Sequence, residues 1–182
     1  MANTKNTLVA DRYSDALVEL AKEGKLTFEK INTDLQLINS TLIQSKDLNE
    51  VLINPTISLE NKKEIIEKVF SQDVDVLIIN LLKVIVDKGR FSIVPDVISS
   101  YGKALDNVNN ISRVNVISAV EMTEEAKNRL QIKLEEKLKK SVVLDIEIDS
   151  NIIAGLIIRM GDNIVDMSLK HKLEDLSKNI LR

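Results

Sequence analysis

Few residues in this chain could carry chemistry. Its 182 residues include one histidine, His171, and no cysteine. A single imidazole cannot complete a zinc site built from the usual histidine and cysteine ligands, and a chain without thiols has neither a disulfide nor a thiolate nucleophile. His171 stands between two lysines, next to the apolar stripe of a helix predicted at the C-terminus. We therefore interpret it as a solvated helix residue.

Two clusters of charged residues are dense enough to suggest a functional site, but their spacing is typical of a solvated surface. Asp145, Glu147 and Asp149 alternate with apolar residues, and strand periodicity places all three on one solvated face. The densest lysines, within residues 133–140, are interleaved with glutamates at the spacing of helical ion pairs. We therefore predict no acid–base pair, no polyanion site, no metal site and no cofactor.

The composition argues against further classes of function. The chain carries 25 basic and 28 acidic residues, whereas a nucleic-acid-binding protein usually needs a basic excess to neutralise phosphates. The longest apolar run, residues 76–86, is shorter than the roughly 20 residues of a membrane helix. The N-terminus lacks the pattern of a signal peptide. We expect a cytoplasmic protein with no nucleic-acid partner and no transmembrane segment.

Apolar residues recur at helical spacing through the first 105 residues. Several boundaries carry a signal of their own. Gly24 would end the first helix, Ser58 would cap the fourth, Gly89 within residues 88–90 would end the fifth, and Pro95 would lie in the first turn of the sixth. The six predicted helices span roughly residues 9–23, 28–42, 48–52, 58–70, 74–86 and 91–105. Short loops between them are typical of an antiparallel six-helix bundle.

After residues 106–110 the apolar period changes from about 3.6 to 2, which indicates strands. Strands are predicted over residues 113–118 and 144–149, with a helix capped by Thr123 between them. A hairpin is predicted over residues 152–165, and a last helix begins near Ser168. One face of this helix carries Leu169, Leu173, Leu176 and Ile180. The fold class is therefore mainly α, with a helical domain at 1–105 and a small α+β domain at 106–182.

Two helices of the first domain carry more apolar residues than a core requires. The first helix has a wide apolar stripe, and the fifth is apolar on nearly all sides. Either the neighbouring helices bury both surfaces, or a groove remains for an amphipathic helix of a partner. The pattern alone leaves both possibilities open.

Five segments occur in a joint order that is far more specific than any one of them. They are Arg12–Leu17 (RYSDAL), Leu52–Ser58 (LINPTIS), Lys88–Arg90 (KGR), Val116–Ala119 (VISA) and Ala154–Asp162 (AGLIIRMGD). In this order the chain resembles the delta subunit of bacterial F-type ATP synthase, which is related to the mitochondrial oligomycin sensitivity conferral protein. The family usually has glycine where this chain has Met167. Glycine adopts positive φ easily and methionine does not, so the substitution raises the question whether residue 167 has a positive φ in this chain.

The resemblance implies a non-catalytic stator subunit of the proton-translocating ATP synthase. Such a subunit links the alpha/beta catalytic head to the b-subunit peripheral stalk, so that rotation is coupled to ATP synthesis. Domain 1–105 would bind the head and domain 106–182 the stalk. The resemblance also implies one copy per complex, held as a peripheral membrane protein at the cytoplasmic face of the bacterial cell membrane.

The resemblance also implies contact residues. In this family a groove between the first and fifth helices receives the amphipathic N-terminal helix of an alpha subunit. Position by position, this points to Tyr13, Ala16, Leu17, Val84 and Lys88. For the stalk contact we expect Lys170 and Lys172 on the last helix, together with residues 151–160. Two alternatives stay open: an adaptor for an unrelated amphipathic helix, and an enzyme, although the sequence offers no matched titratable pair.

Overall fold

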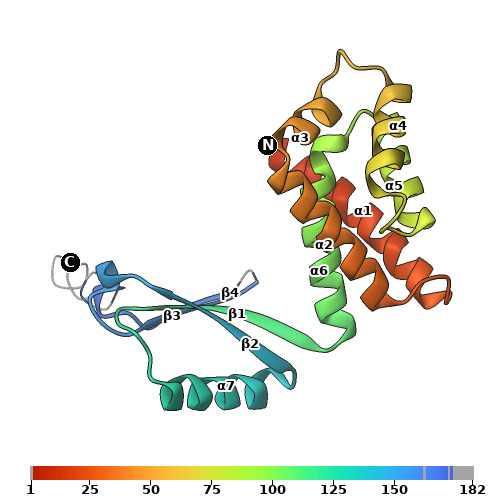
Figure 1. The fold of residues 1–182 in the computed structure, drawn as a ribbon. Helices are drawn as coiled ribbons and strands as arrows, with labels where there is room; N and C mark the ends of the chain where they lie inside the picture. Colours follow the sequence, from red (N-terminus) through yellow and green to blue (C-terminus); the bar gives the residue numbers. More distant parts are fainter. Residues whose placement is uncertain (1, 162, 172, 174–182) are drawn as a thin grey trace. The chain divides into compact units, whose positions relative to one another are not determined.

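The structure is a computed structural model that describes residues 2–161, 163–171 and 173 (Figure 1). The chain divides into two compact units, residues 1–105 and 106–182. It is mainly helical, with a small four-stranded sheet in the second unit. The helices of the first unit are α1 (Ala2–Lys22), α2 (Phe28–Gln44), α3 (Lys46–Ile53), α4 (Leu59–Phe70), α5 (Val76–Asp87), a 3-10 turn η1 (Phe91–Ile93) and α6 (Val94–Val108).

Local signals set several helix ends where the sequence predicts them. Ser58 caps α4, because its hydroxyl accepts a hydrogen bond from the N–H of Asn61 at 3.3 Å. Gly89 follows α5 with φ of 63°, a conformation that glycine adopts without strain. Pro95 lies in the first turn of α6, where its missing N–H costs little.

The core of the first unit is aliphatic and centres on α5. Ile78, Leu82 and Ile85 of this helix are at most 1% exposed. Tyr101 of α6 is also fully buried, and its hydroxyl donates to the backbone oxygen of Phe28 at 3.1 Å. Burial raises the pKa of Tyr101 to about 12. The prediction of a central fifth helix is confirmed.

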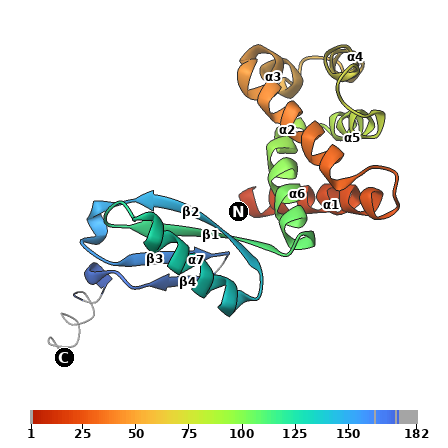
Figure 2. The ribbon, with the colours of Figure 1, turned by 60° about the horizontal axis from the view of Figure 1, so that its bottom comes forward.

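The second unit is a four-stranded sheet covered on one face by a helix, as Figure 2 shows. Its elements are β1 (Ile111–Ser118), α7 (Glu124–Leu138), β2 (Ser141–Ile148), a 3-10 turn η2 (Ser150–Ile152), β3 (Leu156–Met160) and β4 (Asn163–Asp166). The strand order is β2-β1-β3-β4, with β1 parallel to β2 and the other pairs antiparallel. Thr123 caps α7, as predicted.

The register of the sheet gives its two faces opposite characters. Val116 is opposite Ile146 and Ile158, and these side chains pack against α7 in the small core. On the other face Asp145 and Glu147 are exposed, which confirms the predicted outward acidic face for these two residues. Asp149 follows the strand and is half-buried.

The third strand is shorter than the sequence predicts. Asp149 accepts a hydrogen bond from the N–H of Asn151 at 2.9 Å and caps the turn η2, a local bond that competes with strand pairing. Ile153 and Gly155 then adopt φ of 68° and 95°. These turns delay the start of β3 until Leu156.

The doubt about Met167 is not supported by the structure, because Met167 has no positive φ. Its N–H donates to the carbonyl oxygen of Leu156 at 2.9 Å, which prolongs the pairing of β3 with β4. The last helix begins after Ser168, whose hydroxyl accepts from the N–H of His171 at 3.2 Å, as predicted. Leu176 and Ile180, predicted on its apolar face, lie outside the described residues. No helix in the described part of the chain has the length and apolar character needed to cross a membrane.

Candidate functional site

One edge of α1 carries an apolar row that is only partly covered. Val9, Tyr13, Ala16 and Leu20 follow one another at steps of four, three and four residues, so they line up along the helix. Val9, Tyr13 and Leu20 are half-buried against the core, whereas Ala16 is exposed. We call this set the α1 row. Ala16 has the smallest side chain of the four.

A second row with the same spacing runs along α5. It consists of Leu77, Leu81, Val84 and Lys88. Leu77 and Leu81 are half-buried, Val84 is 46% exposed, and Lys88 is exposed at the C-terminal end of the helix. We call this set the α5 row. Val84 and the two half-buried leucines form a partly exposed apolar strip along α5.

The other edge of α5 is occupied by α4. Lys83 of α5 pairs with Glu67 at 2.8 Å, and Asp87 pairs with Lys63 at 2.5 Å. Figure 2 shows α5 between α4 and α1. Because α4 covers the edge that carries Lys83 and Asp87, and the α5 row lies on another face of the helix, α4 leaves the α5 row uncovered.

The predicted contact residues do not all reach this surface. Tyr13, Ala16, Val84 and Lys88 each have exposed or half-buried side chains on the two rows. Leu17 is 0% exposed and belongs to the core, so its side chain lies on neither row, and its contact with a partner stays a prediction. One residue corresponds to a rotation of about 100° on a helix, which turns Leu17 inward while Ala16 stays outside. The other members of the two rows share the same helical spacing but were not among the predicted contacts. They are Val9, Leu20, Leu77 and Leu81.

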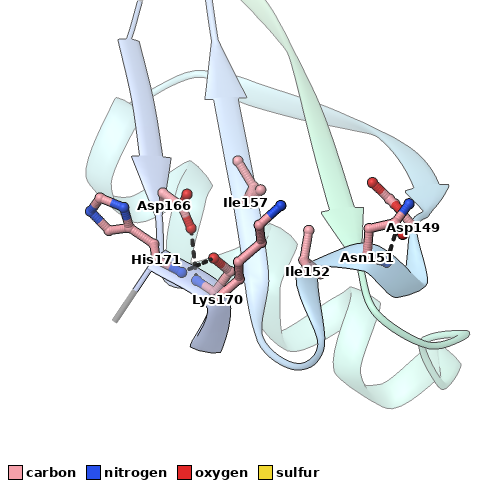
Figure 3. A pocket seen from close by; sticks show the side chains of 8 residues that line it. Asp149, Asn151, Ile152, Ile157, Asp166, Lys170 and His171 are labelled. Carbon is pink, nitrogen blue, oxygen red and sulfur yellow. Dashed lines mark hydrogen bonds between the residues drawn. The ribbon is translucent and has the colours of Figure 1, made fainter. Parts of the chain in front are cut away.

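In the second unit, Lys170 lies at a cavity of about 330 Å³ (Figure 3). The cavity is also lined by residues from η2, β3, β4 and the start of the last helix. Of the two lysines predicted to contact the stalk, Lys170 is exposed. Lys172 lies outside the described residues.

The polar groups at this cavity hold the backbone in place. Asp149 accepts from the backbone and side-chain nitrogens of Asn151 at 2.9 and 2.7 Å. Asp166 accepts from the N–H of Ser168 at 2.8 Å. Hydrogen bonds from the side chain and backbone of Ser168, aided by nearby His171, lower the pKa of Asp166 (Figure 3). Because both carboxylates stabilise turns, we assign the cavity a structural role and not a catalytic one.

The sequence model of the ATP synthase delta (OSCP) subunit matches residues 9–180. The chain belongs to this family. The ATP synthase subunit delta of Clostridioides difficile is 32% identical over 173 residues, 95% of this chain and 96% of that protein. The subunit of Desulfotalea psychrophila is 33% identical over 178 residues, 97% of each chain. A chain of the Toxoplasma gondii mitochondrial ATP synthase hexamer shares the fold, with a TM-score of 0.72 at 19% identity over 95% of this chain and 97% of that one.

Membership of the ATP synthase delta (OSCP) family confirms the resemblance found in the sequence. The chain is a non-catalytic stator subunit of F-type ATP synthase. It is a peripheral part of a membrane-associated complex, in which subunits of this family contact the catalytic head and the peripheral stalk. This role replaces the two alternatives of an unrelated adaptor and an enzyme.

Proposed function

We propose that the first unit, as an antiparallel six-helix bundle, binds the N-terminal helix of an alpha subunit between the α1 row and the α5 row. Two exposed apolar positions carry this proposal, Ala16 on the α1 row and Val84 on the α5 row. An amphipathic helix laid along the rows would cover both. The half-buried Tyr13 would supply the aromatic anchor that such interfaces favour.

The chemistry of these rows suits a stator. A stator must hold the catalytic head against the torque of the rotating shaft, so it needs static, well-packed interfaces and no reactive pocket. An interface of about 800 Å² per partner is of the standard size for a stable complex. Exposed Lys88, at the end of the α5 row, would add a charged hydrogen bond to an acidic residue of the partner helix.

The second unit, residues 106–182, would bind the b-subunit stalk. The exposed ammonium group of Lys170 and the segment from Asn151 to Met160 are the proposed contacts within the described residues. Lys172 belongs to the same proposal on sequence grounds. One such subunit per complex, at the cytoplasmic face of the membrane, would join the head to the stalk.

A crosslinking experiment tests the position of the alpha helix. The chain has no cysteine, so Val84→Cys introduces a unique thiol that can carry a short photo-crosslinker before the chain is assembled with the rest of the complex. We expect crosslinks from position 84 to the N-terminal segment of one alpha subunit. Val69→Cys on α4 is the matched control, because Val69 is 41% exposed. Equal crosslinking from both positions would argue against the proposed groove.

A deletion tests the division between the units. Removing residues 106–182 should abolish binding to the b subunit and leave binding to the alpha segment intact. Loss of both interactions, in a truncated chain that keeps its helical circular dichroism, would contradict the separate roles of the two units.

A further inference from the structure

Strand β2 is an edge strand of the described sheet, and only part of its open edge is covered. Val142 has both backbone groups occupied by side chains of α7. Its N–H donates to Glu135 Oε1 at 3.1 Å, and its carbonyl oxygen accepts from Gln131 Nε2 at 2.9 Å. These bonds close the first part of the edge, at the start of the strand.

Farther along β2 the edge is open. Backbone groups of successive strand residues point alternately to the two sides. Since Val142 points away from β1, Leu144 and Ile146 point the same way, whereas the N–H of Asp149 points back to Ser118 of β1 at 2.9 Å. In the described part of the chain, no residue pairs with Leu144 or Ile146 on this side. Unpaired groups of this kind are a template for an added strand.

A cavity lies beside this open edge and gives it room for side chains. It has a volume of about 450 Å³ and lies between α7 and β2. Leu144 and Ile146 are half-buried in its wall, and Lys127 and Gln131 of α7 form part of its rim. Alternate side chains of a strand added to β2 would point to this side of the sheet. Apolar side chains would fit there, because Leu144 and Ile146 form the wall that they would contact.

The opposite face selects the charge of the partner. Asp145 and Glu147 are exposed on this face, next to the open edge. In an antiparallel pair of two β2 strands these carboxylates would meet their own copies, and like charges across a strand pair are destabilising. A strand that carries lysine or arginine on this face would form favourable pairs instead.

We propose that the open edge of β2 binds an extended segment of another polypeptide, in which apolar residues alternate with lysine or arginine. The segment adds a fifth strand to the sheet beside Leu144 and Ile146. Its apolar side chains enter the cavity between α7 and β2, and its basic side chains lie beside Asp145 and Glu147. This surface is separate from the rows on α1 and α5, so the proposal stands whether or not the alpha helix binds there.

The test uses the full chain and a blocked heptapeptide of alternating lysine and valine. In amide NMR spectra we expect the peptide to shift the signals of Leu144 and Ile146 most strongly. Two further peptides are N-methylated, one at every valine and the other at every lysine. Only the groups that face β2 matter for pairing, so one of these peptides should lose binding and thereby show the direction of the added strand.

Charge reversal supplies the second arm of the test. Asp145→Lys together with Glu147→Lys should weaken binding of the lysine peptide roughly tenfold and strengthen binding of a glutamate–valine peptide, because attractive cross-strand pairs become repulsive. Glu50→Lys with Glu136→Lys gives the same change in net charge at exposed positions away from the edge. This control should bind the lysine peptide like the original chain.

Several results would overturn the proposal. They are no shift at β2 with millimolar peptide, undiminished binding of both N-methylated peptides, and equal effects of the two double substitutions. Concentration-dependent protection of the β2 amides without peptide would show that a second copy occupies the edge. If deleting residues 174–182 were required before the peptide could bind, the chain's own C-terminal segment would be the occupant.

Discussion

The backbone N–H of Asp75 donates to Asp34 Oδ2 at 2.9 Å, and so joins α2 to the start of α5. Asp34 is 1% exposed, and its other oxygen accepts from Lys30 at 2.7 Å. Asp75 in turn caps α5, since its side chain accepts from the N–H of Leu77 at 2.8 Å. One buried carboxylate therefore helps to fix where α5 begins, and with it the position of the α5 row.

Replacing Asp34 should destabilise the helical unit. Asp34→Ala leaves the N–H of Asp75 without its acceptor in a poorly solvated position, so we expect a loss of about 1–3 kcal/mol in the free energy of unfolding. Asp34→Asn keeps an acceptor oxygen for Asp75 and should cost less. Urea unfolding of the full chain measures both. Equal losses in the two variants would show that the bond to Asp75 contributes little.

Ala16→Lys should block the docking of the alpha helix without unfolding the chain. A long charged side chain in the middle of the α1 row would fill the space that an apolar partner residue needs and would be desolvated on binding. We expect at least about a tenfold loss of affinity for an alpha N-terminal peptide, measured by calorimetry. Gln36→Lys, at an exposed position of α2, adds the same charge and should leave the affinity unchanged. Equal affinities for both variants would count against this site.

The sequence predicts helix boundaries best where the signal is local. The Ser58 cap and the Gly89 stop act through their own neighbours, and the structure has both. The start of α1 at Ala2 was not predictable in this way, because residues 2–7 carry no apolar period that a core would impose. Likewise, the sequence predicts an earlier start for the third strand than the structure has. The side chain of Asp149 accepts a hydrogen bond from the N–H of Asn151 and forms a turn before the strand begins.

The proposed docking surface shows a different limit of the sequence. Ala16 and Leu17 are both apolar and adjacent, yet one is exposed and the other fully buried. Which edge of a wide apolar stripe stays open depends on the neighbouring helices, and helical period alone does not give their positions. The same holds for β2, because the order of strands along the chain does not show that β2 lies at the edge of the sheet.

Tyr101 makes the stability of the chain fall at high pH. Burial raises its pKa from 10.0 to about 12, so the unfolded chain releases this proton at lower pH than the folded chain does. The contribution of Tyr101 is therefore complete below pH 10 and is lost as the pH rises from 10 to about 12. Tyr101→Phe removes the hydroxyl and should remove this part of the pH dependence. Urea unfolding of both chains between pH 8 and 11 measures the difference, and parallel curves would contradict the assignment.

Tyr101→Phe should also have an effect at neutral pH. The substitution deletes the hydrogen bond to the carbonyl oxygen of Phe28, which is part of the link between α6 and α2. It keeps the aromatic ring in the core, so we expect a loss of only about 1 kcal/mol. Tyr101→Ala, which leaves a cavity as well, should cost about 3–5 kcal/mol. A similar loss for both variants would show that the ring contributes little to packing.

Two glycine substitutions should have opposite signs. Gly155 has φ of 95°, and a Cβ atom there would collide with the backbone oxygen of Met167. Gly155→Ala should therefore destabilise the second unit by more than about 1 kcal/mol and speed hydrogen exchange at Met167 and Leu169, whose N–H groups bond to Leu156 and Ala154. Gly102, inside α6, has no atom near an added Cβ and no positive φ. Gly102→Ala should therefore stabilise the chain by about 0.5–1 kcal/mol. Unchanged or increased stability of Gly155→Ala would contradict the collision with Met167, and a loss of stability in Gly102→Ala would contradict the open space at Gly102.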